Sequence, residues 1–319
     1  MEQAQLAVVL AVGLPLIGSL LVSLLHRASY VAKAYLAVVF AAAAFIASGA
    51  VAYSILTQGA VAVEAALFKA PGLEVHRLFY GDALGALFAL IAGFFGFMAI
   101  LYSVDDMAHE EEGHARYYAL MLLFQGSMIG LFLAGDLLMI FAFWELVGLC
   151  SYGLIGFYKR KSESAKASMK ALVMTHACGA AILIGILAVL AGGLSLDVPE
   201  LEATALGALG LLSVASLLFL LGSMAKSVQL PFHTWLPDAT VAPSAVTAFL
   251  HSAAMVKAGV YLMARSLALL PAFYVSPGSA VNLALATVGA ATLTVCAAAA
   301  WLQDDVKRLL AYSTAAQIG

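Results

Sequence analysis

Long apolar stretches constrain the fold of this 319-residue chain more than any other feature. Hydrophobic residues make up 64% of the chain and charged residues 10%, whereas a soluble domain carries about 25% charged residues. The mean hydropathy is +1.02. A membrane-crossing helix needs about 20 apolar residues, and only helices and closed barrels satisfy their own backbone in lipid. The pattern therefore predicts an all-α integral membrane protein.

Windows of this length place the predicted spans. They lie near residues 4–25, 34–57, 83–104, 117–134, 137–157, 170–192, 207–230, 243–265 and 281–302. Residues 306–319 are helical in character but too short to cross the bilayer. We therefore expect a helical bundle of about 9–10 spans, in which the chain stops inside a helix.

The placement of Lys and Arg residues predicts the orientation. One side of the membrane receives Arg27, Lys33, Arg116, Lys159, Arg160, Lys161, Lys166, Lys170, Lys307 and Arg308. The other side receives Lys69, Arg77 and Arg265. Because cytoplasmic loops carry an excess of Lys and Arg, we expect a multi-pass protein of the plasma (inner) membrane. Its N-terminus would lie outside, and the 158–169 loop in the cytoplasm.

Several classes of function find no support in the composition. The net charge of −3 does not indicate nucleic acid binding. The cysteines Cys150, Cys178 and Cys296 are far apart, with no CxxC spacing and no histidine cluster beside them. Neither a disulfide framework nor a metal site is indicated by this spacing. The chain also carries no cofactor-binding fingerprint.

Two segments between the spans are more polar. Residues 58–80 alternate loosely between apolar and polar types, which predicts an external hairpin. Residues 193–206 predict a short amphipathic surface helix. Neither segment suggests an independent soluble domain.

The segment after Lys226 predicts a broken helix. Three prolines follow in close succession: Pro231, Pro237 and Pro243. Because proline lacks a backbone donor and clashes with the preceding turn, a helix cannot run straight through this segment. Interrupted helices that carry polar residues, here His233 and Asp238, point to a transport site. The alternative is a loop between two ordinary spans, with Asp238 as a helix cap.

Charged residues lie inside predicted spans at Glu145, Lys226 and Lys257. A charge at bilayer depth costs at least about 2.5 to 3.5 kcal/mol, so such residues mark ion paths or pair with one another. Opposite charges 4 Å apart attract by about 4 kcal/mol at an effective dielectric of 20, and by about 1.7 kcal/mol at 10 Å. A small change in the distance between Glu145 and Lys226 would therefore change which group holds the proton. The alternative for Glu145 is a neutral carboxyl hydrogen-bonded to a neighbouring helix.

Histidines extend this candidate relay. His251 and Lys257 share the span 243–265 and point about 120° apart on a straight helix, so they are candidates for successive stations on a polar path. Histidine titrates near neutrality and suits proton transfer. His176 either extends the relay or only packs, and His251 either takes part or satisfies a neighbouring backbone group.

Three long motifs carry a family resemblance. They are FAFWELVGLCSYGLIGFY (141–158), AKSVQLPFHTWLPDATVAPSAVTAFLHSAAMVKAGVYLMAR (225–265) and DDVKRLLAYSTAAQIG (304–319). From about residue 60 onward the chain resembles the antiporter-like membrane subunits. This family includes the large subunit of Mrp-type cation/proton antiporters and the distal proton-pumping subunit of respiratory complex I, with related membrane-bound hydrogenases.

The resemblance implies two inverted five-helix repeats, each with a discontinuous helix. We therefore expect N-terminal spans with the external hairpin in residues 1–110 and the first repeat in 111–266. Residues 267–319 would start a truncated second repeat.

The resemblance also implies a chain of charged residues at the bilayer midplane. Glu145 matches the glutamate of the family's fifth helix, and Lys226 the lysine of its broken seventh helix. His251 matches the eighth-helix histidine, and Lys307 lies in the motif that starts the tenth helix. His176 matches neither branch cleanly.

The resulting hypothesis is a cation- and proton-translocating subunit of a multi-subunit complex, with other hydrophobic subunits, H⁺ and Na⁺ as partners. Lys257 within MVKAGVYLMAR favours the large subunit of an Mrp-type Na⁺/H⁺ antiporter. WELVGLCSYGLIGFY is more typical of complex I, in which the chain would be a translocase subunit of an NADH:quinone oxidoreductase, or of a hydrogenase relative. Further alternatives are a membrane subunit of an inorganic-carbon-concentrating complex and a purely structural scaffold. The chain itself is expected to carry no catalytic chemistry.

Overall fold

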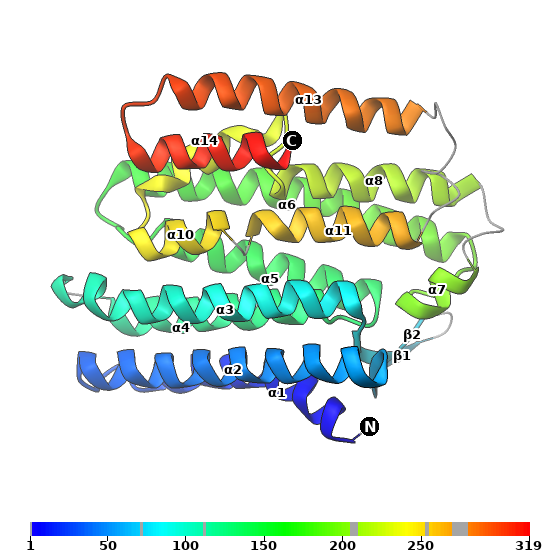
Figure 1. Ribbon diagram of the computed structural model, residues 1–319, viewed down its shortest axis with the longest axis horizontal. Helices are drawn as coiled ribbons and strands as arrows, with labels where there is room; N and C mark the ends of the chain where they lie inside the picture. Colours follow the sequence, from blue (N-terminus) through cyan, green and yellow to red (C-terminus); the bar gives the residue numbers. More distant parts are fainter. Residues whose placement is uncertain (1, 71–72, 111–112, 205–209, 253–254, 270–279) are drawn as a thin grey trace.

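A computed structural model of the chain describes residues 2–70, 73–110, 113–204, 210–252, 255–269 and 280–319. Its helices run side by side along one axis, with α1 and α2 at one edge of the bundle and α13 and α14 at the other (Figure 1). Parts of several predicted segments lie outside the described residues. They are 71–72 of the hairpin, 205–206 of the surface helix, 207–209 of one span and 253–254 of another.

Six helices form the first half of the bundle. They are α1 (Glu2–Leu24), α2 (Tyr30–Gln58), α3 (Ala83–Asp106), α4 (His114–Phe132), α5 (Leu137–Ile155) and α6 (Ser162–Ala191). A short 3-10 turn, η1 (Met107–His109), continues α3. Side-chain oxygens cap three of these helices, since Ser29, Asp82 and Asp136 accept hydrogen bonds from the first turns of α2, α3 and α5. These caps satisfy backbone donors that a helix start leaves unpaired.

The second half contains the broken segment. It comprises α7 (Val198–Thr204), α8 (Gly210–Lys226), η3 (Phe232–Thr234), α9 (Trp235–Asp238), η4 (Ala239–Val241), α10 (Ser244–Ser252), α11 (Met255–Leu269), α13 (Ala280–Trp301) and α14 (Val306–Ile318). The predicted helix break after Lys226 is confirmed, because α8 ends there and only short helical turns connect it to α10.

The predicted all-α membrane fold is confirmed. Among the described residues, seven helices are long and apolar enough to cross a membrane, namely α1, α2, α3 with η1, α5, α6, α10 with α11, and α13. The helix α4 is more polar, yet almost every residue from Tyr117 to Phe132 is buried. A helix enclosed by other helices does not face lipid, so it tolerates side chains such as Gln125, which donates to the Gly93 carbonyl at 3.0 Å.

A β-hairpin lies at one end of the bundle, within the segment where the sequence predicts one. Strands β1 (Val61–Ala70) and β2 (Leu73–Gly81) pair antiparallel, with Val61 opposite Gly81. The hairpin is fixed to the connection between α4 and α5, because the Tyr80 N–H donates to the Leu133 carbonyl at 2.8 Å. The short helix α7, predicted within 193–206, lies at the same end (Figure 1).

A buried ion pair links the end of α11 to the start of α3. The Arg265 guanidinium is 1% exposed and donates to both Asp82 carboxylate oxygens, at 2.6 and 2.8 Å. Its Nε and Nη2 also donate to the Tyr261 hydroxyl, which in turn donates to the Phe132 carbonyl at 3.1 Å. The bidentate geometry suits the planar guanidinium and joins α3, α4 and α11. Burial alone would raise the pKa of the Asp82 carboxyl, but the hydrogen bonds and charge of Arg265 hold this pKa below its usual 3.8.

We predict that Asp82→Ala lowers the free energy of unfolding by about 3–5 kcal/mol, because it leaves the buried Arg265 charge unpaired. The folded-state pKa of Asp82 is lowered, so the stabilisation is complete at neutral pH and is lost as the pH falls through that pKa. Thermal denaturation of the purified chain in detergent measures the effect. Asp105→Ala, at an exposed carboxylate near the other end of α3, is the matched control. Equal melting temperatures for the two variants would contradict the prediction.

Candidate site at the break of helix α8

The centre of the candidate site is a carboxylate–imidazole contact between α5 and α6. Glu145 Oε2 lies 3.1 Å from His176 Nε2, and each side chain is about three-quarters buried. The other imidazole nitrogen, Nδ1, lies 3.2 Å from the Leu172 carbonyl on its own helix. The contact becomes an ion pair when the imidazole is protonated. It places two proton-binding groups within direct reach of each other inside the bundle.

Two glycines make room for this contact. A Cβ atom on Gly148 of α5 would lie 2.6 Å from His176 Cε1, and a Cβ atom on Gly179 of α6 would collide with Glu145 Oε1. Each glycine follows the residue of its own helix by three positions, so it lies on the same helix face one turn further on. The glycine of one helix thus accommodates the side chain of the other. Any larger residue at either position would displace the carboxylate or the imidazole.

Lys226 lies next to this contact, at the last residue of α8. Its side chain is 1% exposed, its Nζ donates to the Trp144 carbonyl, and Nζ lies 4.1 Å from the centre of the Trp144 ring. Trp144 directly precedes Glu145 on α5. A buried ammonium over an aromatic face gains a cation–π interaction, which partly offsets its lost hydration. The Glu145 carboxylate and the Lys226 ammonium also interact electrostatically.

The break of α8 is what directs Lys226 into the site. The Ala225 carbonyl, which a continuing helix would use, accepts from Trp235 Nε1 at 2.9 Å. The Leu230 N–H donates to Thr292 Oγ1 of α13 at 3.0 Å. On the other side, α11 approaches closely at Gly259, where a Cβ atom would lie 2.6 Å from the Ser227 nitrogen. Protein groups therefore surround the irregular backbone, as a break at membrane depth requires.

Several polar atoms of the site have no hydrogen-bond partner among the described residues. They are Trp144 Nε1, Glu145 Oε1, His233 Nδ1 and both ring nitrogens of His251, together with His176 Nε2, which has the contact with Glu145 but no hydrogen bond. Most buried polar atoms in proteins are hydrogen-bonded, and exceptions call for an explanation such as a functional role or a bound water. Four such atoms lie elsewhere among the described residues, namely Arg77 Nε, Arg116 Nε, Gln125 Oε1 and Asp197 Oδ2, so missing partners are not confined to this site.

His251 and Lys307 form a second group, where α10 lies near the start of α14. His251 is 8% exposed, and its ring interacts electrostatically with Lys307. Lys307 Nζ donates to the Ala242 carbonyl at 3.3 Å, so α14 is tied to the broken segment just before α10. Lys257 on α11 is half-buried and makes no ion pair within the described residues. Residues 253–254, between His251 and Lys257, lie outside the description.

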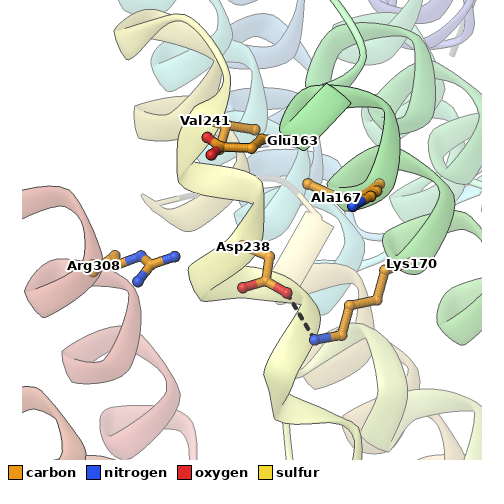
Figure 2. Close-up of a pocket in the computed structure, with 7 residues that line it drawn as sticks. Glu163, Ala167, Lys170, Asp238, Val241 and Arg308 are labelled. Atoms are coloured by element: carbon orange, nitrogen blue, oxygen red, sulfur yellow. Dashed lines mark hydrogen bonds and ion pairs between the residues drawn. The ribbon is translucent and has the colours of Figure 1, made fainter. Parts of the chain in front are cut away.

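A pocket of about 320 Å³ lies between α6, the broken segment and α14. Lys170 Nζ binds Asp238 Oδ2 at 2.7 Å and the Thr234 carbonyl at 3.2 Å. Figure 2 shows Asp238 between Lys170 of α6 and Arg308 of α14, with Glu163 further along the pocket. Lys170 and Asp238 are both more than a third exposed. The pocket is therefore a charged depression at the surface, and Lys170 lies six residues, or about 9 Å along the axis of α6, from His176.

The structure brings together some of the sequence-predicted residues and separates others. Glu145 and Lys226 are neighbours through Trp144, but the direct partner of Glu145 is His176 and not Lys226. His233 lies in η3, beside the Thr234 carbonyl that holds Lys170.

The sequence indicates only orientation for Lys170, and for Asp238 either a polar residue of the interrupted transport segment or a helix cap. Lys170 lies six residues before His176 on the same helix, and this spacing is a signal that the sequence offers. The pairing with Asp238 depends on the fold of the broken segment and has no local sequence signal.

The chain matches the family model described as "NADH:quinone oxidoreductase/Mrp antiporter, TM" over residues 134–319. It is 40% identical over 245 residues to the chloroplastic NAD(P)H-quinone oxidoreductase subunit 5 of Zygnema circumcarinatum, covering 75% of this chain and 34% of that protein. It is 38% identical over 251 residues to the A1 subunit of a Na(+)/H(+) antiporter of Staphylococcus haemolyticus, covering 78% of this chain and 30% of that protein. The chain thus spans about a third of the length of these relatives.

A solved structure shows the same fold. The Mrp complex from Dietzia sp. DQ12-45-1b contains a chain similar to this one, with a TM-score of 0.81 and 32% sequence identity. The match covers 99% of this chain and 33% of that chain. The arrangement of α1 to α14 is therefore close to that of a longer membrane subunit.

We predict that Gly179→Ala lowers the free energy of unfolding by about 1–3 kcal/mol, because its methyl group would overlap Glu145 Oε1. Gly49→Ala, where a methyl group meets nothing within 4 Å, is the control and is expected to be neutral or stabilising by up to about 1 kcal/mol.

The cause of this effect is tested by combining Gly179→Ala with Glu145→Ala. Without the carboxylate the methyl group has space, so the two changes are expected to be non-additive in a double-mutant cycle measured by thermal denaturation. Strict additivity would contradict this assignment of the contact.

Proposed function

Because the chain belongs to the NADH:quinone oxidoreductase/Mrp antiporter transmembrane family, we propose that it translocates protons as part of the large subunit of an Mrp-type Na⁺/H⁺ antiporter. The observation that carries this proposal is the position of Lys226. A fully buried ammonium lies at the Trp144 carbonyl, one residue from a carboxylate that contacts a histidine. Buried ionisable groups are costly in a membrane protein, and those that occur usually pair with one another or line the path of an ion.

The proposed mechanism rests on the competition for one proton among Glu145, His176 and Lys226. When His176 is protonated, its contact with Glu145 neutralises the carboxylate charge, and the ammonium of Lys226 loses electrostatic support. When His176 is neutral, the carboxylate charge favours the charged lysine. The strength of this coupling depends steeply on distance in a medium of low dielectric. A small movement of α5, α6 or the end of α8 would therefore transfer the proton from one group to the next.

The proposed route begins at the charged pocket. Lys170 and Asp238 line it where α6 meets the broken segment, and His176 follows about 9 Å along α6. From Lys226 the route would continue to His251 and Lys307, whose imidazole and ammonium interact. His233 lies at the edge of the route, and we assign Lys257 to a station further along α11. In a longer subunit, the next stations would lie beyond this chain.

The proposal includes a place in the membrane and in a complex. The chain would lie in the plasma membrane with its N-terminus outside. The cytoplasm would then contact the basic residues of the 158–169 loop and of the start of α14. Residues 111–266 would form one five-helix repeat, following the N-terminal spans in 1–110, and 267–319 would start the next. Other hydrophobic subunits would cover exposed faces such as that of α13, where Leu283, Leu293 and Trp301 are exposed.

A second candidate is a proton-pumping subunit of a redox-driven complex. It is favoured by the 40% sequence identity to a NAD(P)H-quinone oxidoreductase subunit. The sequence identity to the antiporter subunit is almost the same, at 38%. Both candidates use the same relay and differ in what drives it. Fluorescence quenching in everted vesicles that hold the complete complex separates them. Na⁺-dependent collapse of a proton gradient without an electron donor supports the antiporter, and NADH-dependent quenching supports the redox pump.

We predict that Glu145→Gln and Lys226→Ala each lower proton transport by at least about tenfold in this assay, because either change removes one side of the electrostatic competition. Lys159→Ala, at an exposed lysine of the α5–α6 loop, is the matched control and is expected to leave transport unchanged. If Glu145→Gln transports protons as fast as the wild type in a correctly assembled complex, the prediction is wrong and the chain is a structural scaffold.

We predict that Lys170→Ala slows transport less than Lys226→Ala does, because the pocket supplies protons and does not hold the relayed charge. Asp238→Asn is expected to act in the same direction, since it removes the partner of Lys170. The exchanged pair Lys170→Asp with Asp238→Lys should restore part of the rate. If the exchanged pair is no better than the single variants, or if Lys170→Ala matches the Lys159→Ala control, the pocket is not on the route.

A further inference from the structure

A histidine and two carboxylates meet at the hairpin end of the bundle, away from the proposed relay. His76 of β2, Asp197 directly before α7 and Glu200 of α7 each offer one ligand atom, and these atoms lie within 4.8 Å of one another. His76 Nε2 lies 3.8 Å from Asp197 Oδ2 and 4.0 Å from Glu200 Oε1. Segments more than a hundred residues apart in sequence thus place three good metal ligands together.

The two oxygens of Asp197 have different surroundings. Oδ1 accepts from the Arg77 guanidinium and from the Glu200 N–H, the latter at 3.1 Å, so it caps the first turn of α7. Oδ2 is buried, has no hydrogen-bond partner among the described residues, and is the atom that faces His76. The Asp197 side chain is only 3% exposed. A buried carboxylate oxygen aimed at an imidazole and a second carboxylate is costly unless a cation or a donor reaches it.

Arg77 fixes the orientation of this carboxylate. Its guanidinium binds Asp197 Oδ1 and lies 3.8 Å from Glu64 of β1. Because Arg77 holds Oδ1, the carboxylate presents Oδ2 in a defined direction. Carboxylates that bind metal ions are usually oriented by such a hydrogen bond. Arg77 also offsets one of the two negative charges, so the three ligand groups and the guanidinium together carry a net charge of about −1 with neutral histidine.

We propose that His76, Asp197 and Glu200 bind a divalent transition-metal ion of the Zn²⁺ class. Nitrogen and carboxylate ligands suit this class, whereas Ca²⁺ takes oxygen ligands only. Zn²⁺ bonds of about 2.1 Å in a tetrahedron separate the ligand atoms by about 3.4 Å. The observed separations of 3.8 and 4.0 Å, within a set that spans up to 4.8 Å, are larger, so the ligands must close around the ion. The side chains of His76 and Glu200 are 39% and 50% exposed, so both can move inward onto the ion.

The ion would fasten the hairpin to the bundle. His76 belongs to β2, whereas Asp197 and Glu200 belong to α7 and its start, next to the α5 cap at Asp136. Arg77 binds Asp197 directly, and Gly135 connects the two elements through backbone hydrogen bonds with Leu78 of β2 and Val198 of α7. A shared metal ion would add a link between β2 and α7 that neither element makes alone, because binding energy at a shared site stabilises the folded state.

The test is a Zn²⁺ titration of the purified, EDTA-washed chain in detergent, with Zn²⁺ binding measured by calorimetry. We expect one Zn²⁺ ion per chain, and at least tenfold weaker binding in His76→Ala and in Glu200→Gln. His26→Ala, at an exposed histidine between α1 and α2, is the matched control and is expected to bind Zn²⁺ as the wild type does. Zn²⁺ should also raise the melting temperature of the wild type but not that of His76→Ala.

Three outcomes would overturn the proposal. One is the lack of stoichiometric Zn²⁺ binding by the wild type at micromolar Zn²⁺. Another is unchanged binding in both His76→Ala and Glu200→Gln, which would place the ion elsewhere. The last is tighter binding of Ca²⁺ than of Zn²⁺. None of these results depends on transport, so they leave the proposed relay untouched.

Discussion

Every polar group at membrane depth must find a partner inside the protein, and this constraint explains the architecture around the break of α8. The Ala225 carbonyl is satisfied by Trp235, the Leu230 N–H by Thr292, and the Lys226 ammonium by the Trp144 carbonyl. The chain stops being helical where three other elements supply these partners. The break, the burial of Lys226 and the contact of its ammonium with Trp144 of α5 are therefore parts of one arrangement.

The same constraint makes the unsatisfied atoms informative. Arg265 shows how completely a buried charge is satisfied where the role is structural, since Asp82 and Tyr261 take up its donors. The carboxyl of Glu145 and the ring of His251 contrast with it, because each keeps buried polar atoms without a partner among the described residues. If these two groups gain and lose a proton as proposed, they cannot be fully committed to fixed hydrogen bonds. This contrast is consistent with the proposed roles of Glu145 and His251, although Arg77, Arg116 and Gln125 also keep a buried atom without a partner among the described residues.

Close helix packing is what brings Glu145, His176 and Lys226 together. Gly148 and Gly179 lie where the His176 ring and the Glu145 carboxylate enter the neighbouring helix face, and Gly259 lets α11 approach the end of α8. These glycines replace side chains that would otherwise hold the helices apart. The electrostatic coupling of the site is thus set by backbone geometry. A change of one methyl group at these positions alters distances on which the interaction energy depends steeply.

The sequence determined the membrane class, the approximate spans, the break after Lys226 and the buried charges, because apolar length, proline chemistry and the cost of charge in lipid are local properties. The hairpin and α7 followed from local polarity in the same way. The contact of Glu145 with His176, the pairing of Lys170 with Asp238, and the meeting of His76 with Asp197 were decided only by tertiary structure. Each joins residues on different helices or strands, and which helix faces which depends on packing that no local pattern records.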